Sequence, residues 1–308
     1  MRILVTGGSG MVGSAFKSVD TDHELILVGS KDYNLKNETH VRKMIKTTRP
    51  DSIIHLAAKV GGIKGNMSYM SDFFYDNIKI NTNVLNESRK FGIKKVLSLL
   101  STCVYPGNPS YPLTEDQIHN GEPHESNFGY AYAKRMLEVQ SRAIRKQYGL
   151  KYITAIPNNI YGENDNFDLE NGHVLPAIIR KVYEAKLTGS SPVFWGSGRP
   201  LREFTYSYDI ATALINLAEN YEDVSPVNIG KTGEISILSV VEKICNILEF
   251  EGKVTWDIEK PEGQYRKPSD NNLFLNIYPN FKYTDINEGL QKTCNWFLNH
   301  YPNIRGAK

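Results

Sequence analysis

Short apolar runs rich in Ile, Leu and Val alternate with amphipathic stretches along the first half of the chain. Runs this apolar are typical of strands buried on both faces of a parallel sheet, whereas apolar residues spaced three or four apart indicate helices. The pattern predicts strands over residues 2–6, 24–28, 51–57, 94–101 and 151–156. It predicts helices over residues 10–19, 72–91 and 126–148. This alternation predicts an α/β fold with a Rossmann-type, doubly wound parallel sheet.

The pattern changes after about residue 160, where polar turns and segments with glycine and proline separate shorter elements. We expect helices over residues 173–186 and 208–221, a short strand over 227–229, and mixed helices and loops over 236–250 and 273–301. These elements predict a smaller, mixed α/β C-terminal lobe that binds the substrate through long loops. The expected division assigns residues 1–162, with about 204–230 returning, to a cofactor-binding domain, and residues 163–203 and 231–308 to the lobe.

Composition and charge narrow the class of protein. The 308 residues carry a net charge of +2, which is too balanced to indicate nucleic acid as the main partner. The sequence has no apolar run long enough to span a membrane and no pattern of a signal peptide. The three cysteines, Cys103, Cys245 and Cys294, have the spacing of neither a disulfide framework nor a metal site. We therefore expect a cytoplasmic enzyme without a membrane segment or a bound metal.

A glycine-rich segment follows the first predicted strand and opens the first predicted helix. It fits G-x-G-x-x-G starting at Gly8 and G-x-x-G-x-x-G starting at Gly7. In both patterns one glycine makes the turn, another admits the pyrophosphate of a dinucleotide, and the last lets the helix pack on the strand. We therefore expect the segment to bind a nicotinamide dinucleotide through Gly7, Gly8, Ser9, Gly10, Met11, Val12 and Gly13.

The residues after the second strand indicate which dinucleotide binds. NAD-binding proteins usually place an Asp or Glu there, where it holds the ribose hydroxyls. Here the strand ends in Gly29-Ser30-Lys31, and Ser30 and Lys31 can receive a 2′-phosphate. This favours NADPH (NADP) as the cofactor. Asp32 keeps NAD open, because a shift of one residue would bring its carboxylate near the ribose.

Tyr130 and Lys134 lie four residues apart in a predicted helix and therefore share one face of it. An isolated tyrosine has a pKa near 10 and is a poor acid–base catalyst at neutral pH. A nearby lysine cation favours the phenolate and can also hold the ribose of the nicotinamide. Ser101, at the end of the predicted strand 94–101, can donate a hydrogen bond to the reacting oxygen. Tyr132, by contrast, has no lysine four residues further on.

The order of these features resembles the extended branch of the short-chain dehydrogenase/reductase family. His55-Leu56-Ala57-Ala58 and Asn81-Thr82-Asn83-Val84-Leu85 add to this likeness. More specific segments resemble the GDP-L-fucose synthase family of epimerase–reductases over nearly the whole chain. These segments are Lys59-Val60-Gly61-Gly62-Ile63, Ser101-Thr102-Cys103-Val104-Tyr105-Pro106, Asn127-Phe128-Gly129-Tyr130, Pro157-Asn158-Asn159-Ile160-Tyr161-Gly162, Asn164-Asp165-Asn166-Phe167, Gly172-His173-Val174-Leu175-Pro176, Trp195-Gly196-Ser197-Gly198 and Arg202-Glu203-Phe204.

The resemblance implies an epimerisation next to a ketone, which needs a base that removes a carbon-bound proton and an acid that returns one. Cys103 and His173 match the family's pair. A thiol is a weak base at neutral pH unless its surroundings lower its pKa, whereas histidine titrates near neutrality. Ser101 and Tyr130 would polarise the ketone, and Tyr130 would give a proton to the oxygen when NADPH reduces C4. The implied catalytic residues are Ser101, Cys103, Tyr130, Lys134 and His173.

The resemblance also implies the binding residues and the assembly. The GDP-linked 4-keto-6-deoxy sugar would contact Lys181, Trp195, Arg202, Glu262 and Lys267. The cofactor would further contact Pro157, Asn158, Asn159, Ile160 and His173, besides Tyr130 and Lys134. The family commonly has Thr at Asn158 and Asp at Glu262, so local contacts to cofactor and nucleotide differ there. A homodimer packed through the helices 72–91 and 126–148 is expected.

Other functions stay open on the residues alone. Another nucleotide-sugar enzyme on the same scaffold is possible: a 4-epimerase, a dehydratase or a colitose-type synthase. Thr102-Cys103 offers no carboxylate beside the serine, which argues against a dehydratase. A cofactor-binding regulator without catalysis would not need Ser101, Tyr130 and Lys134 together.

Overall fold

A parallel sheet forms the centre of the first half of the molecule. The computed structural model describes residues 1–223, 225–260 and 263–307. Within these residues six strands pair side by side, all parallel, in the order β10-β5-β4-β3-β1-β2. Their bounds are β1 Arg2–Thr6, β2 Glu24–Val28, β3 Ser52–His55, β4 Lys95–Leu99, β5 Lys151–Ile156 and β10 Val227–Asn228. The expected doubly wound α/β fold is confirmed.

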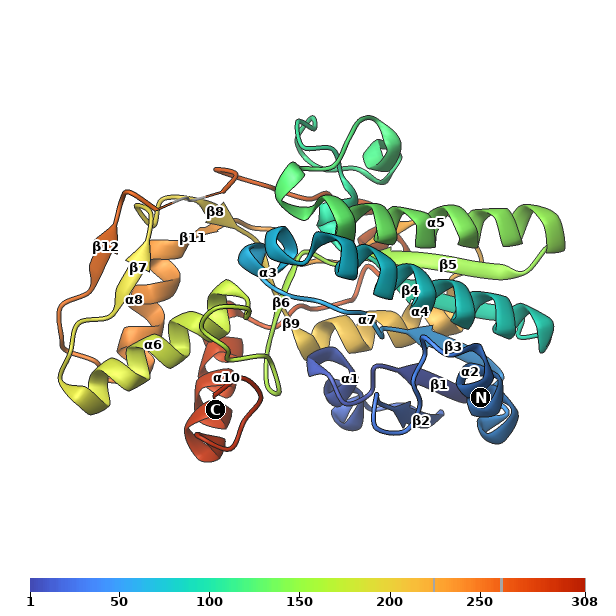
Figure 1. The fold of residues 1–308 in the computed structure, drawn as a ribbon, viewed down its shortest axis with the longest axis horizontal. Coiled ribbons are helices and arrows are strands. Elements are labelled where there is room, and N and C mark those ends of the chain that lie inside the picture. Colours follow the sequence, from blue (N-terminus) through green and yellow to red (C-terminus); the bar gives the residue numbers. More distant parts are fainter. Residues whose placement is uncertain (224, 261–262, 308) are drawn as a thin grey trace.

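Helices cover both faces of this sheet (Figure 1). Leu4 points to the face covered by α2, α4 and α5, whereas its neighbours Ile3 and Val5 point to the face covered by α1 and α7. A strand buried on both sides must be apolar at every position, which explains the continuous apolar runs. The bounds on these faces are α1 Met11–Ala15, α2 Glu38–Thr48, α4 Met70–Lys90, α5 Phe128–Tyr148 and α7 Ser207–Asn220.

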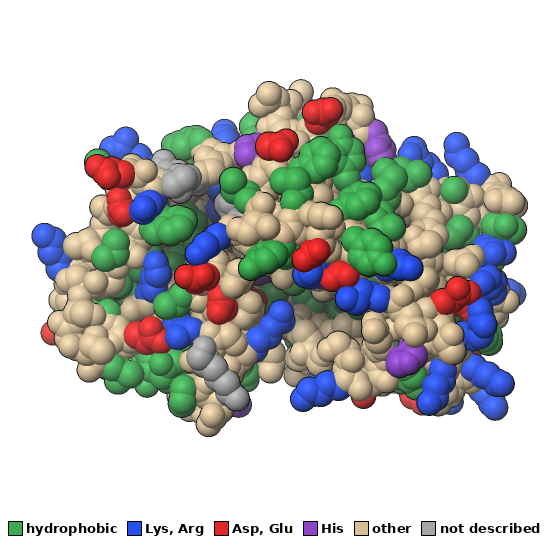
Figure 2. Space-filling model, in the orientation of Figure 1, with side chains coloured by type: hydrophobic (Ala, Val, Ile, Leu, Met, Phe, Trp, Pro, Cys, Tyr) green, Lys and Arg blue, Asp and Glu red, His purple; other side chains and the backbone are tan. Residues whose placement is uncertain are grey.

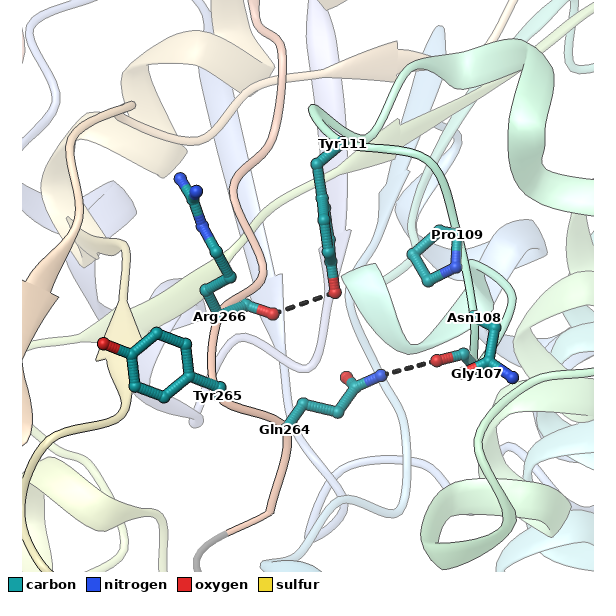
Figure 3. Close-up of a pocket in the computed structure, with 7 residues that line it drawn as sticks. All are labelled: Gly107, Asn108, Pro109, Tyr111, Gln264, Tyr265 and Arg266. Atoms are coloured by element: carbon teal, nitrogen blue, oxygen red, sulfur yellow. Dashed lines mark hydrogen bonds between the residues drawn. The ribbon is translucent and has the colours of Figure 1, made fainter.

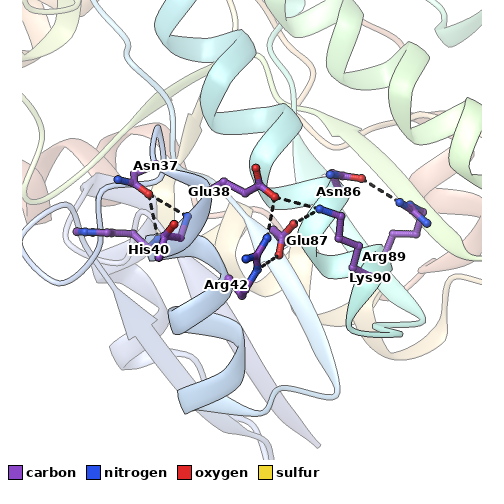
Figure 4. A network of polar contacts seen from close by, with 9 residues as sticks. Asn37, Glu38, His40, Arg42, Asn86, Glu87, Arg89 and Lys90 are labelled. Carbon is purple, nitrogen blue, oxygen red and sulfur yellow. Dashed lines mark hydrogen bonds and ion pairs between the residues drawn. The ribbon is translucent and has the colours of Figure 1, made fainter.

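Helix α2 was not among the expected elements. The sequence nevertheless contains a helix-start residue, Asn37. Its side chain accepts hydrogen bonds from the N–H groups of Thr39 and His40 and so caps the helix. A second reason for its stability is a polar network with α4 (Figure 4). The fully buried carboxylate of Glu87 accepts hydrogen bonds from Arg42 of α2 and Lys90 of α4. Polar contacts thus hold α2 in place, although its apolar pattern is too short to predict the helix.

The second half of the chain builds a lobe with its own core (Figure 1). Three helices enclose this core, α6 Val174–Thr188, α8 Ile237–Ile247 and α10 Ile286–His300, and α9 Asn272–Ile277 packs on the sheet instead. Three short strand pairs complete the described part of the structure. Two belong to the lobe, β7 Val193–Trp195 with β12 Thr255–Asp257 and β8 Leu201–Arg202 with β11 Ile235–Ser236. The third, β6 Asn159–Tyr161 with β9 Phe204–Tyr206, lies where the chain leaves the sheet domain and returns to it. The mixed α/β lobe expected from the sequence is therefore present.

Two expected boundaries differ at the carboxyl edge of the sheet, where the candidate site lies. Strand β4 ends at Leu99, so Ser101 does not end the strand but precedes a 3₁₀ turn, η2 Thr102–Val104. Helix α5 begins at Phe128, after the 3₁₀ turn η4 Glu125–Asn127. The remaining short helices are η1 Phe16–Ser18, α3 Ile63–Ser68 and η3 Glu115–His119. Among the described helices, none combines the length and apolar character that crossing a bilayer requires.

Candidate active site

The glycine loop connects β1 to α1 and takes the form of the G-x-x-G-x-x-G pattern. Gly7 adopts a left-handed backbone with φ of 76°, and its carbonyl accepts a hydrogen bond of 2.9 Å from the N–H of Gly10. A Cβ at Gly13 would collide with that same carbonyl, so only glycine lets the helix pack here. Gly10, by contrast, has open space beyond the Gly7 carbonyl. The loop therefore leaves a cradle at Gly10 that fits a closely approaching phosphate.

The segment after β2 lies beside this loop. Gly29 is the first residue after β2 and packs against Ser9. A Cβ at Gly29 would lie only 2.5 Å from the Ser9 hydroxyl. The carboxylate of Asp32 accepts a hydrogen bond of 2.7 Å from the Gly29 N–H, which closes a tight turn. Ser30 and Lys31 are exposed on this turn. One oxygen of Asp32 is thus engaged in the turn, and the exposed side chains of Ser30 and Lys31 beside it can receive a ribose or its phosphate.

Lys134 lies in α5 and reaches the carboxyl end of β4. Its buried ammonium donates a hydrogen bond of 2.6 Å to the carbonyl of Leu99. Burial lowers the pKa of Lys134 to about 8, although the nearby Cys103 opposes this shift. The hydrogen bond fixes α5 against the strand that leads to Ser101.

Tyr130 lies one helical turn before Lys134, with the Lys134 ammonium 5.8 Å from its ring centroid. Its ring packs edge-on against Phe73 of α4, at 6.4 Å between centroids. Burial raises the pKa of Tyr130 well above its usual value, and the negative potential of Cys103 adds to the effect. The phenol therefore keeps its proton, so Tyr130 is poised to donate it and not to remove one.

Cys103 lies in the turn η2, directly after the carboxyl end of β4. The Ser101 hydroxyl caps this turn by accepting the N–H of Cys103 at 3.4 Å. Burial raises the pKa of the Cys103 thiol, while the cations of Lys267 and Lys134 and the Ser101 hydroxyl act in the opposite direction. Cys103 is thus hydrogen-bonded to Ser101 and affects the pKa values of Tyr130 and Lys134, so the four residues form one cluster at the carboxyl edge of the sheet.

His173 approaches from the lobe, as the residue that precedes α6. Its side chain is 46% exposed, and its Nδ1 lies 3.9 Å from Oδ1 of Asp165. Among the described interactions, no hydrogen bond joins His173 to Ser101, Cys103, Tyr130 or Lys134. Asp165 lies in the segment Asn164-Asp165-Asn166-Phe167, and no motif or spacing in that segment marks this carboxylate as functional.

The segment Pro157–Ile160 holds together the two halves of the molecule. Asn158 is buried, accepts a hydrogen bond of 2.6 Å from Thr205 and donates one of 2.8 Å to the carbonyl of Lys231. Asn159 is exposed and donates to the carbonyl of Glu203, and Ile160 packs on the sheet core. The Asn158 side chain is therefore engaged inside the protein.

A buried hydrogen-bonded pair, His55 and Asn81, could not be predicted from the sequence, because its members lie on elements that are far apart along the chain. His55 at the end of β3 bonds to Thr6 of β1 at 2.8 Å and to Asn81 of α4 at 3.1 Å. Burial lowers the pKa of His55 to about 3, so the ring is neutral. Asn81 in turn donates to the carbonyl of Ala133, the residue before Lys134. The family segment around His55 thus supports the helix that carries the tyrosine and lysine.

The candidate substrate residues lie on the lobe. Trp195 is 56% exposed, so it is not a residue of the lobe core. Lys181 donates to the carbonyl of Val193 at 2.9 Å. Arg202 donates to the carbonyl of Leu201 at 2.7 Å, and burial lowers the pKa of Lys267 to about 8. Glu262 lies outside the described residues.

An open cavity of about 370 Å³ lies where the loop after Cys103 meets the segment before Lys267 (Figure 3). Two hydrogen bonds join its walls: Gln264 donates to the carbonyl of Gly107 at 2.8 Å, and Tyr111 donates to the carbonyl of Arg266 at 2.9 Å. These bonds fix the segment that carries Lys267 beside the loop that follows Cys103.

Comparisons with known proteins agree with this geometry. A GDP-L-fucose synthase of Dictyostelium discoideum is 42% identical over 98% of this chain and 97% of its own length. A GDP-L-colitose synthase of Yersinia pseudotuberculosis is 36% identical over 98% of this chain and 100% of its own length. The crystal structure of a GDP-L-fucose synthetase from Naegleria fowleri bound to NADP has a TM-score of 0.93 at 39% identity, and the match covers 99% of this chain and 94% of that one. The model of the NAD dependent epimerase/dehydratase family matches residues 3–230. Because the family model and these relatives cover most of the chain, the protein belongs to the NAD dependent epimerase/dehydratase family.

Proposed function

We propose that the chain catalyses the reaction of a GDP-L-fucose synthase. In this reaction GDP-4-keto-6-deoxy-D-mannose is epimerised at C3 and C5 and then reduced at C4. The observation that carries the proposal is the cluster of Ser101, Cys103, Tyr130 and Lys134 at the carboxyl edge of the sheet. The relatives of that name, at up to 42% identity, support it.

The cofactor in this proposal is NADPH, which supplies the hydride for C4. The open cradle at Gly10 fits its pyrophosphate, and the exposed Ser30 and Lys31 fit a 2′-phosphate. The NADP in the Naegleria fowleri structure supports the same choice. We propose Gly7, Gly8, Ser9, Gly10, Met11, Val12, Gly13, Ser30, Lys31, Tyr130, Lys134, Pro157, Asn158, Asn159, Ile160 and His173 as the cofactor-binding residues.

The chemistry follows from the protonation states of the side chains. Tyr130 keeps its proton and donates it to the C4 oxygen as the carbon is reduced. In the preceding epimerisations Cys103 and His173 exchange the protons at the carbons beside the ketone, while Ser101 and Tyr130 stabilise the charge on its oxygen. Burial raises the pKa of the Cys103 thiol, and the nearby cations of Lys267 and Lys134 act against this shift and favour the thiolate that removes a carbon-bound proton.

For the nucleotide sugar we propose Lys181, Trp195, Arg202 and Lys267, with Glu262 as a further candidate. A diphosphate requires cations, and three of these side chains provide them. The exposed indole of Trp195 offers a flat surface on which a base or a sugar can stack.

The alternative with a specific observation in its favour is a colitose-type synthase, because the Yersinia pseudotuberculosis relative is 36% identical. The two reactions differ at C3, where the colitose-type substrate lacks a hydroxyl. Rates with the two keto-sugars, compared as kcat/KM, therefore distinguish them.

We further propose a homodimer, a division into two domains and a cytoplasmic site of action. Apolar side chains gather on the outer surface over α3, α4 and α5 (Figure 2). Phe74, Tyr75, Met136 and Tyr148 on α4 and α5 are each more than a third exposed, and a second copy would cover them. The cores of sheet and lobe support domains of 1–162 with 204–230, and of 163–203 with 231–308, although α9 packs on the former core and Tyr161, Phe204 and Tyr206 pack in the latter. Three free cysteines suit a reducing compartment.

The direct test follows NADPH absorbance while the protein is incubated with GDP-4-keto-6-deoxy-D-mannose. Oxidation of NADPH that requires both the enzyme and the keto-sugar is expected. The matched control replaces the keto-sugar by GDP-mannose, which has no ketone to reduce. A rate no higher than this control would refute the proposed function.

A further inference from the structure

The loop before α6 is anchored at its first end by the lobe core. Asn164 adopts a left-handed backbone with φ of 62°, which turns the chain inward. Phe167 is fully buried, stacks on Trp296 at 6.1 Å between centroids, and donates its N–H to the carbonyl of Arg305 at 2.9 Å. Asp165, between these two residues, is therefore held in a fixed place.

The second end of the loop is anchored by a carboxylate and by the sheet domain. Asp168 accepts hydrogen bonds from the N–H groups of Asn171 at 2.6 Å and Glu170 at 3.0 Å. The carbonyl of Asn171 accepts one of 2.9 Å from the N–H of Gly62, in the loop after β3. This turn brings His173 back towards Asp165.

One oxygen of Asp165 has no hydrogen-bond partner among the described residues. The residue is 5% exposed, and its Oδ1 accepts the N–H of Asn166 at 2.7 Å. Its Oδ2 is buried without a hydrogen bond to any described residue. A buried carboxylate oxygen left unpaired is costly, so it requires a donor. The imidazole of His173 lies beside this carboxylate, with 3.9 Å between its Nδ1 and Oδ1, the other oxygen of the same group.

We propose that Asp165 is a positioning residue that acts through His173. A rotation of the half-exposed ring brings Nδ1–H into hydrogen-bond contact with the Asp165 carboxylate, at about 2.8 Å. With Nδ1 held there, Nε2 is directed away from Asp165 and towards the substrate. A carboxylate fixes the tautomer and orientation of a catalytic histidine in the same manner in hydrolase triads.

The consequence concerns proton transfer at carbon and rests on the proposed function. The protonated imidazole donates its Nε2 proton to the carbon beside the ketone in the enolate, whose C=C electron pair forms the new C–H bond while the C=O bond is restored. The electron pair of the broken N–H bond stays on Nε2, so the ring becomes neutral and keeps its Nδ1 proton, hydrogen-bonded to the Asp165 carboxylate. Solvent then restores the Nε2 proton. The Asp165 carboxylate stabilises the charged ring before the transfer and orients it throughout.

The first test separates epimerisation from reduction. Asp165→Asn keeps the shape of the side chain but removes its charge. Deuterium incorporation from D₂O into the keto-sugar should slow roughly 10- to 100-fold. This is less than the full contribution of a general acid–base catalyst, because the His173 ring is still present but no longer oriented. NADPH-dependent reduction of the already epimerised keto-sugar should stay within about twofold, since Tyr130 supplies that proton.

Asp168→Ala is the matched control, because it disturbs the loop without removing the Asp165 carboxylate. It should slow exchange and reduction together. Unchanged exchange in Asp165→Asn, or an equal loss of both activities as in Asp168→Ala, would overturn the proposal.

The second test does not depend on the substrate. Proton–nitrogen correlation spectra of ¹⁵N-histidine-labelled protein report the tautomer of each ring, and His173→Asn identifies the His173 signal by its absence. The Nδ1–H form is expected in the wild type with GDP bound, and a mixture of tautomers in Asp165→Asn. The same tautomer in both proteins would refute the proposal even if the chain proved to act on another sugar.

Discussion

The ammonium of Lys134 donates a hydrogen bond of 2.6 Å to the carbonyl of Leu99, the last residue of β4. This contact joins the helix that carries Tyr130 to the strand that leads to Ser101 and Cys103. It also places a cation in a buried position, where burial lowers its pKa to about 8. The protonation of Lys134 therefore changes within an accessible pH range.

The rate should fall as Lys134 loses its proton. Since the pKa of Lys134 is lowered to about 8, the cation is present below that pH and is lost above it. The kcat/KM for NADPH reports groups of the free enzyme, so it should fall about tenfold per pH unit above this pKa. A profile that stays flat to pH 9.5 would contradict the role of Lys134. Lys267→Gln, assayed at saturating keto-sugar, should show the same fall.

Tyr130→Phe should lower kcat for reduction by about 10²- to 10⁴-fold, because the phenol no longer donates its proton. Tyr132→Phe is the matched control, since Tyr132 lies in the same helix and packs on Phe128 through its ring. It should retain near wild-type kcat in the NADPH assay. Equal losses in the two variants would show that the helix, and not the Tyr130 hydroxyl, determines the rate.

Lys31→Ala should weaken NADPH binding without weakening NADH binding. A charged hydrogen bond to the 2′-phosphate contributes about 1.5–3 kcal/mol, so the Kd for NADPH should rise roughly 10- to 100-fold. Lys94→Ala removes an exposed lysine at the amino end of β4 and should leave both Kd values unchanged. Isothermal titration of the wild type and the two variants with each cofactor measures these Kd values, and a wild type that prefers NADH would refute NADPH as the cofactor.

Met136→Glu should convert the proposed dimer into a monomer, because it places a charge among the exposed apolar side chains of α4 and α5. Leu298→Glu on α10 replaces a similarly exposed apolar residue elsewhere and should not change the assembly. Sedimentation equilibrium measures the mass, which is 34.9 kDa for the monomer. A wild-type mass of one chain would exclude the dimer.

Glu87→Gln should destabilise the fold by about 1 kcal/mol, because two charged hydrogen bonds between α2 and α4 weaken while their partially exposed partners remain hydrated. Burial alone would raise the pKa of Glu87, but the hydrogen bonds from Arg42 and Lys90 outweigh it and lower the pKa. The contribution is therefore full above the unfolded pKa of about 4.3 and is lost as the pH falls through the folded value. Urea unfolding should show a smaller difference between wild type and variant below pH 4 than at pH 7.

The apolar pattern was sufficient to predict the sheet, because strands buried on both faces leave a continuous signal, as in β1, β4 and β5. It was insufficient for α2, whose position depends on the Asn37 cap and on Glu87 in another helix. Motifs likewise indicated Tyr130 and Lys134, which lie on one helix. Asp165 and Asn81 could not be inferred in this way, because their roles arise from contacts between segments that fold together.

One site is expected both to epimerise a keto-sugar and to reduce it. Incubation of the protein with GDP-4-keto-6-deoxy-D-mannose and NADPH in D₂O, followed by NMR of the product, measures both activities together. We expect a product with the L configuration, deuterium at C3 and C5, and one NADPH consumed per molecule. A reduced product that retains hydrogen and the original configuration at C3 and C5 would show that the site does not epimerise its substrate.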